Sequence, residues 1–148
     1  MARFRYRLQN ILEIKEKMET QARQNFADAR KALDQEEETL RLLYEKQAAL
    51  DREAVELRSG VLDFRDINDN HMARQLNEQA ISAQMIRVRR AESALERMRQ
   101  ALEDAIKDRK IYEKLREKAF DEYMLEENRA ESKVIDELTT YTYGQKDK

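Results

Sequence analysis

The residues that could perform acid–base or metal chemistry in this chain are few and widely spaced. His71 is the only histidine, and the acidic residues that could assist it, Asp69 and Glu78, lie two and seven positions away. The chain has no cysteine, which excludes thiolate chemistry, and no phosphate-binding loop of the GxxxxGK type. Acidic pairs such as Glu126–Glu127 are typical of a solvated helix face. The sequence therefore predicts a non-enzymatic protein with no cofactor and no metal site.

The composition indicates long helices rather than a mixed globular fold. Of 148 residues, 41% are charged, none is proline and only two are glycine, while Ala, Glu, Lys, Leu and Arg make up more than half. This bias is typical of coiled coils, and the shortage of turn residues argues against a sheet. No apolar window is long enough to span a membrane. Reducing compartments suit a chain that lacks cysteine.

The charge distribution gives no support to a nucleic-acid partner. The formal net charge is −2, so the chain creates no broad positive field. Arg87, Arg89 and Arg90 cluster, but Glu92 and Glu96 follow directly, and residues 87 and 90 share a face that residue 89 does not. The sequence therefore predicts no DNA or RNA partner.

The first half of the chain has an apolar repeat with alternating steps of three and four residues, which predicts one seam of a coiled-coil helix. Its members are Phe26, Ala29, Leu33, Glu36, Leu40, Leu43, Gln47, Leu50, Ala54 and Leu57. Upstream, the seam is expected to continue through Phe4, Leu8, Ile11, Lys15, Met18 and Ala22. Two successive steps of four, from Met18 to Ala22 to Phe26, predict a stutter.

A break at Arg58-Ser59-Gly60 separates this seam from a second one. Gly60 can adopt the left-handed conformation that ends many helices, and one of the Asp or Asn residues from Asp63 onwards is expected to cap the next helix. The second seam is predicted at Val88, Ala91, Leu95, Met98, Leu102, Ala105, Arg109 and Tyr112, with Ile81 and Met85 leading in. After a shift of phase it continues through Leu115, Ala119 and Tyr123.

These patterns predict an all-α fold in which two long helices form an antiparallel coiled-coil hairpin. We expect a single coiled-coil domain over residues 1–148, with helix one over 3–58, a turn over 59–66, helix two over 67–141 and a frayed tail over 142–148. With the fold near Leu62, residue i faces a residue numbered near 124 − i. The second helix then overhangs over residues 122–141, and the apolar side chains there, Met124, Leu125, Val134, Ile135 and Leu138, are expected to bind another protein or to fray.

The N-terminus carries an apolar stripe, Phe4, Leu8, Ile11 and Leu12, beside Arg3, Arg5 and Arg7. Three interpretations remain open at this point. The stripe can lie on an anionic membrane, dock with its arginines on an acidic protein rim, or pack on the second helix while the arginines stay solvated.

Three segments resemble the FliJ family, the small coiled-coil proteins of the bacterial flagellar export apparatus. The start resembles the family's opening at residues 4–16, FRYRLQNILEIKE. Residues 112–118, YEKLREK, are similar to its charged repeat, and residues 127–137, ENRAESKVIDE, to its terminal motif. Length, hairpin break and the spacing of the two ends also match, so the resemblance spans nearly the whole chain.

The resemblance implies a two-helix stalk similar to the gamma subunit of rotary ATP synthases. Such a stalk sits in the ring of the export ATPase FliI, links it to the export gate FlhA and assists substrate chaperones. It also implies a cytoplasmic location, peripheral at the membrane, and a role in flagellum biogenesis, motility and chemotaxis. The implied ring contacts are Arg7, Arg116, Arg129, Glu131, Lys133 and Asp136, with Leu8 and Leu115 tying the end together.

Exposed apolar and aromatic residues near the middle of the helices are the candidates for binding the gate: Leu42, Tyr44, Leu76 and Ile81. Flanking positions of a seam would show the same residue types. Two other functions share the hairpin, a self-associating coiled-coil scaffold and the equivalent stalk of a virulence type III secretion system. A peripheral membrane binder is a further hypothesis, which rests on Arg3, Arg5 and Arg7.

Overall fold

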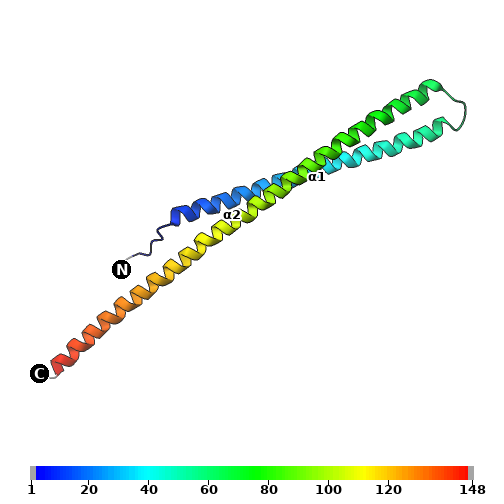
Figure 1. Cartoon of the computed structure of the whole chain (residues 1–148). Coiled ribbons are helices and arrows are strands. Elements are labelled where there is room, and N and C mark those ends of the chain that lie inside the picture. The colour runs from blue at the N-terminus through cyan, green and yellow to red at the C-terminus, as the bar shows by residue number, and fades with distance from the viewer. Residues whose placement is uncertain (1–2, 147–148) are drawn as a thin grey trace. The chain divides into compact units, whose positions relative to one another are not determined.

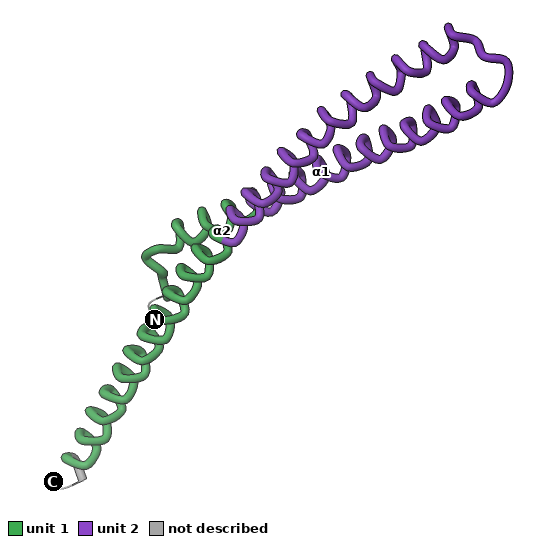
Figure 2. The backbone as a smooth tube through the Cα atoms, turned by 45° about the vertical axis from the view of Figure 1, so that its right-hand side comes forward, with its two compact units in different colours: residues 1–20, 104–148 green, residues 21–103 purple. Residues whose placement is uncertain are grey.

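The computed structural model describes residues 3–146, which form two helices and, over that range, no strand. Helix α1 spans Gln9–Leu57 and α2 spans Phe64–Lys146 (Figure 1). They pack antiparallel as a coiled-coil hairpin, which confirms the predicted fold class. The chain divides into two compact units (Figure 2): unit 1 combines Met1–Thr20 with Asp104–Lys148, and unit 2 is Gln21–Glu103. The prediction of a single domain stays a prediction.

The N-terminal segment, residues 3–8, is not helical, whereas the sequence predicts a helix from residue 3. Phe4, Tyr6 and Leu8 are half-buried, and the arginines between them are exposed. This alternation has the period of an extended chain, in which residues i and i+2 point the same way. In a helix, Phe4 and Tyr6 would point about 200° apart and could not both reach α2. A turn closed by Gln9 N–H donating to Tyr6 C=O at 3.0 Å then starts α1.

The end of α1 differs from the prediction at Gly60. No glycine among the described residues has a positive φ, so Gly60 does not form a left-handed cap. Instead the last turn tightens: Arg58 N–H donates to Val55 C=O at 3.2 Å and Ser59 N–H to Glu56 C=O at 3.1 Å. The Ser59 hydroxyl also donates to Val55 C=O at 2.7 Å. These bonds occupy carbonyls that a helix end otherwise leaves unpaired, so the left-handed turn is not needed.

The start of α2 is capped by Asp63, one of the residues predicted for this role. Its carboxylate accepts a hydrogen bond from Arg65 N–H at 2.9 Å, and its carbonyl accepts the first helical bond, from Ile67 N–H, at 3.1 Å. This is the usual geometry of an N-cap, and it places the helix start at Phe64 rather than residue 67. At the other end α2 remains helical to Lys146, past the predicted end at Tyr141. The last two residues of the predicted frayed tail lie outside the described residues.

In unit 2 the α1 seam matches the prediction, because every seam residue from Phe26 to Leu57 is at least half-buried. The α2 seam differs near its start. Ile81 lies in it as expected, but Gln84 rather than Met85 is the next buried residue. Upstream the seam continues through Asn77 and Asn70, both buried. Asn70, Asn77 and Gln84 are spaced by seven residues, and we call them the amide row.

The amide row binds the backbone of α1. Asn70 Nδ2 donates to Leu50 C=O and Asn77 Nδ2 to Leu43 C=O, both at 3.0 Å, and Gln84 Nε2 donates to Glu36 C=O at 2.9 Å. Each helical carbonyl has a second lone pair, so it accepts this bond without losing its helical one. Asn77 also donates to Gln47 Oε1 at 2.9 Å, a pair whose numbers add to the predicted 124. Polar seam residues of this kind fix the register of a coiled coil at a cost in stability.

In unit 1 the seam against α2 runs through Leu8, which directly precedes α1, and then through Leu12, Lys15 and Glu19 of α1, not through Ile11 and Met18. Leu12 and Glu19 are buried, and Met18 is half-exposed. With these members the steps of three and four alternate without interruption through residue 26, so the predicted stutter is wrong. The prediction was wrong because it assigned the seam position after Lys15 to the apolar Met18 instead of the charged Glu19. Glu19 enters the seam because Arg109 on α2 pairs with its carboxylate.

Beyond the last contacts with the N-terminal segment, every residue of α2 from 128 to 144 is exposed. We call residues 128–144 the overhang. The sequence predicts it over 122–141, but Tyr123 is half-buried against Phe4. The five apolar residues that were expected to lack a partner, Met124, Leu125, Val134, Ile135 and Leu138, are all exposed.

Candidate protein-binding site

The N-terminal segment is fixed to α2 by aromatic side chains. The ring of Phe4 meets Phe120 edge to face, with centroids 5.2 Å apart and an interplanar angle of 82°, and lies 5.4 Å from the ring of Tyr123. The Tyr6 hydroxyl donates to Tyr112 C=O at 3.2 Å. Of the three interpretations of the N-terminal stripe, these contacts favour packing on the second helix. Arg3, Arg5 and Arg7 stay exposed along the edge of the segment.

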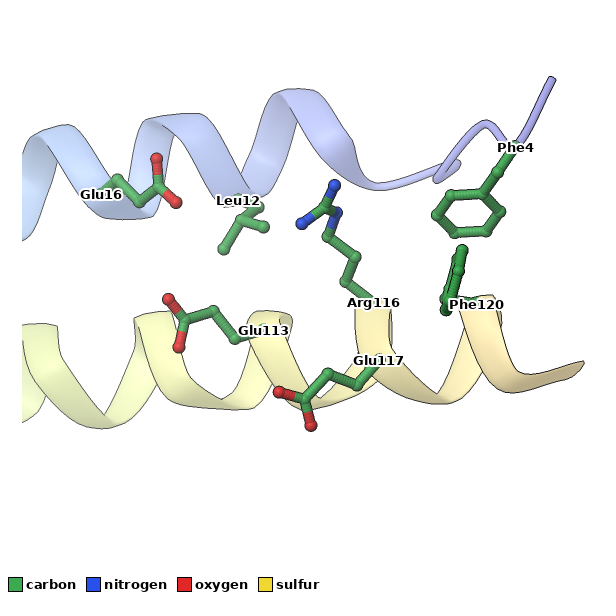
Figure 3. A pocket seen from close by; sticks show the side chains of 7 residues that line it. All are labelled: Phe4, Leu12, Glu16, Glu113, Arg116, Glu117 and Phe120. Atoms are coloured by element: carbon green, nitrogen blue, oxygen red, sulfur yellow. The ribbon is translucent and has the colours of Figure 1, made fainter. Parts of the chain in front are cut away.

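Two hollows lie beside this aromatic contact, and both hold predicted ring-binding residues. The first, of about 540 Å³, is lined by Phe4, Leu12 and Phe120 together with charged side chains. Figure 3 shows Arg116 reaching from α2 toward the space between Leu12 and Phe4. The second, an open groove of about 830 Å³, is lined by residues that include Arg7, Leu8 and Leu115. The structure therefore brings these predicted residues to one end of unit 1.

Ion pairs connect α1 and α2 at the part of the seam next to the first hollow. Arg109 binds Glu19 across the two helices and Glu113 on its own helix, the latter at 2.6 Å. The hydrogen bonds to Glu113 and then to Glu19 raise the pKa of Arg109. Lys15 Nζ lies 3.5 Å from Asp108 Oδ2 and 5.9 Å from the centroid of the Tyr112 ring. The arginine stays charged, so this part of the seam is held by ion pairs.

The overhang presents two different faces. Val134, Leu138 and Tyr141 continue the apolar seam of α2 past the last contact with the N-terminal segment, and all three are more than half exposed. Ala130, Glu131, Val134 and Ile135 line a small hollow of about 330 Å³ on this side. Arg129 and Asp136 lie about 140–160° around the helix from Val134, on the opposite side, and Lys133 lies about 100° from it, on the flank. Of the predicted ring residues on the overhang, only Glu131 therefore borders the apolar face.

The structure separates the four residues predicted to bind the export gate. Ile81 is a half-buried seam residue of unit 2. Leu42 and Tyr44 are about half-exposed and flank the seam residue Leu43 on opposite sides, because two helical residues differ by about 200°. Tyr44 meets Met85, its hydroxyl lying 3.9 Å from the sulfur. Leu76 is 62% exposed and lies on the same flank as Leu42.

Sequence reasoning missed Phe120 and the glutamates of the first hollow, Glu16, Glu113 and Glu117. Phe120 carries a signal that could have found it, since its number and that of Phe4 add to 124. The glutamates carry none, because acidic residues are frequent along both helices.

Comparison with known families gives the chain's family. A family model described as flagellar FliJ protein matches residues 4–148. The chain belongs to the FliJ family. It is therefore a component of the flagellar export apparatus, a structural protein in a family that is not known for catalysis. No curated protein and no solved structure matches this chain.

The part of the chain that the structure describes includes no helix with enough consecutive apolar residues to cross a membrane. The match to the family model includes both halves of the predicted site, the N-terminal segment and the overhang. The individual contacts predicted for the ATPase ring and the gate stay predictions.

Proposed function

We propose that this chain is a non-enzymatic stalk that binds and stabilises the ring of the export ATPase FliI. The single observation that carries the proposal is the overhang of a FliJ-family chain, where the apolar side chains of Val134 and Leu138 are exposed to solvent in the described structure. An apolar helix stripe that its own chain leaves uncovered is typical of a binding surface. The ATPase would supply the ATP site.

The proposed contact surface combines the overhang with the end of unit 1. Val134, Leu138 and Tyr141 provide apolar area, Arg129 and Asp136 provide charges on the opposite side, and Lys133 provides one on the flank. A stalk inside a ring meets subunits on several sides, so both faces of one helix can be used. Arg7 and Arg116 extend the charged surface beside the N-terminal segment, where Phe4 and Phe120 hold it in place.

The contact with the export gate FlhA is proposed on the flank of unit 2 that carries Leu42 and Leu76. Both side chains are exposed, and neither is a seam residue. Tyr44 is proposed as a second contact with the gate, on the other flank. Ile81 is proposed to support the Leu42 and Leu76 surface by packing within the seam. Substrate chaperones are proposed as further partners, and the resulting location is the cytoplasmic face of the membrane, reached through the gate.

A titration of the chain into the export ATPase from the same genome tests the ring proposal. ATP hydrolysis and the dissociation constant of the complex are measured for the wild-type chain, Leu138→Asp, Arg129→Glu and Arg7→Glu. We expect stimulation by the wild type and weaker binding by all three variants, with unchanged helicity because these positions are exposed. Loss in Leu138→Asp alone would assign the contact to the apolar face only.

Arg52→Glu is the matched control, since Arg52 is exposed, makes no ion pair in the described structure and lies in unit 2. Its affinity should equal that of the wild type. Equal affinity in all the variants would contradict the site, and absence of both stimulation and binding would contradict the stalk itself.

The same exposed stripe favours a second candidate function, a scaffold that self-associates through its overhang. A scaffold predicts a stable homodimer or larger oligomer that Leu138→Asp dissolves, whereas a stalk predicts a monomer. Light scattering on the purified chain separates the two. The flagellar stalk is preferred over its virulence-system equivalent because the matching family model is the flagellar one.

A further inference from the structure

Three arginines on the outward side of α2 in unit 2 have no partner in the described chain. Arg89, Arg90 and Arg97 are exposed and make no ion pair there. Together with Ile86 and Ser93 they line a shallow hollow of about 530 Å³. We call these five residues the basic face. Sequence reasoning grouped Arg89 and Arg90 with Arg87 and found the cluster too small, whereas the structure replaces Arg87 with Arg97, one heptad after Arg90.

The absence of partners here has a cause in the sequence. Two other arginines of unit 2, Arg41 and Arg99, are each held by a glutamate three residues before and a glutamate four residues after them. Arg41 binds Glu38 at 2.6 Å and also Glu45, and Arg99 binds Glu96 at 2.5 Å and Glu103 at 2.6 Å. The hydrogen bond from Arg41 lowers the pKa of Glu38, so that pair is charged over a wide pH range.

The arginines of the basic face have no glutamate at either of these positions. The residues three before and four after Arg90 are Arg87 and Ala94, and those around Arg97 are Ala94 and Ala101. Arg89 has Glu92 three residues after it, but Arg90 and Arg97 have no acidic residue three or four positions away. The charges of Arg90 and Arg97 are therefore not neutralised by their own helix and remain available to a partner.

The spacing of the basic face matches that of a helix-packing seam. Ile86, Arg90, Ser93 and Arg97 follow one another by four, three and four residues, the same alternation as in the seam between α1 and α2. Each lies two residues from a seam residue such as Val88 or Leu95, about 200° around the helix. Ile86 supplies an exposed apolar side chain, and the small Ser93 allows a neighbouring helix to approach closely.

We propose that the basic face of unit 2 is a docking site for an acidic amphipathic helix of another protein. Its carboxylates would pair with Arg90 and Arg97, and its apolar residues would pack on Ile86 and over Ser93. The inference is independent of the proposed ATPase-ring contact, which lies in unit 1. A membrane surface is less suitable, because the face holds one large apolar residue and an interfacial helix needs a broad apolar stripe.

The test uses the full chain and a labelled synthetic helix of three heptads, with Leu at position a and Glu at position d. Fluorescence anisotropy measures its affinity for the wild type and for the double variant Arg90→Glu/Arg97→Glu. Replacing attraction by repulsion at two exposed ion pairs should weaken binding at least about tenfold. A peptide in which Gln replaces each Glu should lose affinity to a similar extent, and salt should weaken the wild-type complex.

The matched control is Arg30→Glu/Arg52→Glu, which makes the same change of charge at two exposed α1 positions that have no ion pair within residues 3–146. The control variant should bind the peptide within about twofold of the wild type. Residues 30 and 52 lie away from the basic face, so salt screens their charges and they contribute little to the binding free energy. Circular dichroism shows that all variants keep their helicity.

Several outcomes would overturn the proposal. Equal loss in both double variants would mean a response to net charge rather than to this face. If the Gln peptide bound as tightly as the Glu peptide, the carboxylates would have no role in binding. The chain alone could instead form a dimer that dissociates in the Arg90→Glu/Arg97→Glu variant. The basic face would then bind a second copy of this chain. Arginine-dependent sedimentation with phosphatidylglycerol vesicles, without peptide binding, would assign the face to lipid.

Discussion

In unit 2 the buried polar residues of the seam are amides on α2, whereas in unit 1 the buried polar residue is the charged Glu19, near aromatic contacts. Asn70, Asn77 and Gln84 donate to carbonyls of α1, a bond that requires the two backbones to run close together. In unit 1, Glu19 and Arg109 reach each other through side chains, and the N-terminal segment is held by ring contacts.

The difference shows two ways of fixing register in a seam with few large apolar residues. An amide bonded to a backbone carbonyl allows one alignment, because a slide by one turn would move the donor to the wrong carbonyl and expose the apolar neighbours. Side-chain ion pairs tolerate small shifts, because long side chains adapt. Unit 1 instead gains its alignment from Phe4 and Tyr6, which have fixed partners on α2.

The largest effect is expected for Asn77→Asp, which breaks the amide row. Asn77 is 3% exposed, and an aspartate there would bury a carboxylate opposite the carbonyl of Leu43 and the oxygen of Gln47. We expect the free energy of unfolding at pH 7 to fall by about 3 kcal/mol or more. Burial raises the pKa of such a carboxyl, and the neutral form can donate a hydrogen bond. The loss should therefore shrink as pH falls toward 4, measured by urea unfolding.

Asn77→Leu is the matched control for this prediction. It removes the hydrogen bonds but also the Asn77 Oδ1 atom, which is buried without a partner, so the change in stability should be small or favourable. A destabilisation by Asn77→Leu as large as that by Asn77→Asp would contradict the view that the amides fix register rather than supply stability.

The aromatic contact of unit 1 is tested by Phe120→Ala, for which we expect a loss of about 1–3 kcal/mol. The variant removes the edge-to-face partner of Phe4, and hydrogen exchange should then increase in residues 3–8 and at the start of α1. Phe64→Ala is the control, since Phe64 is an exposed phenylalanine in unit 2 with no ring contact among the described residues. Equal exchange at the N-terminus in both variants would mean that ring packing does not hold the segment.

A smaller effect is expected from Glu19→Gln. The variant keeps the size of the side chain but removes one carboxylate from Arg109, which Glu113 still binds. The midpoint of thermal unfolding should fall by about 2–4 °C at low salt and by less at high salt. Glu16→Gln, at an exposed position of the same helix, serves as control. An equal shift in the two variants would remove the special role of Glu19 in the seam.

The smallest effect concerns the turn. Gly60 has no positive φ, and a Cβ added there would meet no atom within 4 Å. Gly60→Ala should therefore raise the free energy of unfolding by about 0.4–1 kcal/mol, because the unfolded chain loses freedom. A destabilisation of similar size would mean that the residue uses the left-handed conformation in solution, as the sequence predicts.

Most of the fold followed from periodicity, and the errors within the seam have one cause. The seam from Phe26 to Leu57 was predictable because apolar residues mark nearly every position. Glu19 and the amide row were missed because a polar residue in a seam looks like a break until its partner is known. The relation that pairs residue i with 124 − i could have found Asn77 with Gln47 and Phe4 with Phe120.

The candidate site was predicted less completely. Arg7, Leu8, Leu115 and Arg116 do gather at one end of unit 1. The charged residues of the terminal motif divide between two faces of the overhang, a distinction that a motif cannot make without the helix phase. Leu42 and Tyr44 look adjacent in sequence but lie on opposite flanks.

Two long helices, their antiparallel pairing, the overhang and membership of the FliJ family all follow from the order of the amino acids, because each depends on local periodicity or on motifs along the chain. The extended N-terminal segment and the polar members of the seam emerge only when the helices are packed together, because a polar residue is buried where another segment offers it a partner. That Arg90 and Arg97 lack an acidic partner on their own helix follows from the sequence. Packing decides that α1 supplies none within the described residues, because the residues of α1 that face a position of α2 are distant in sequence.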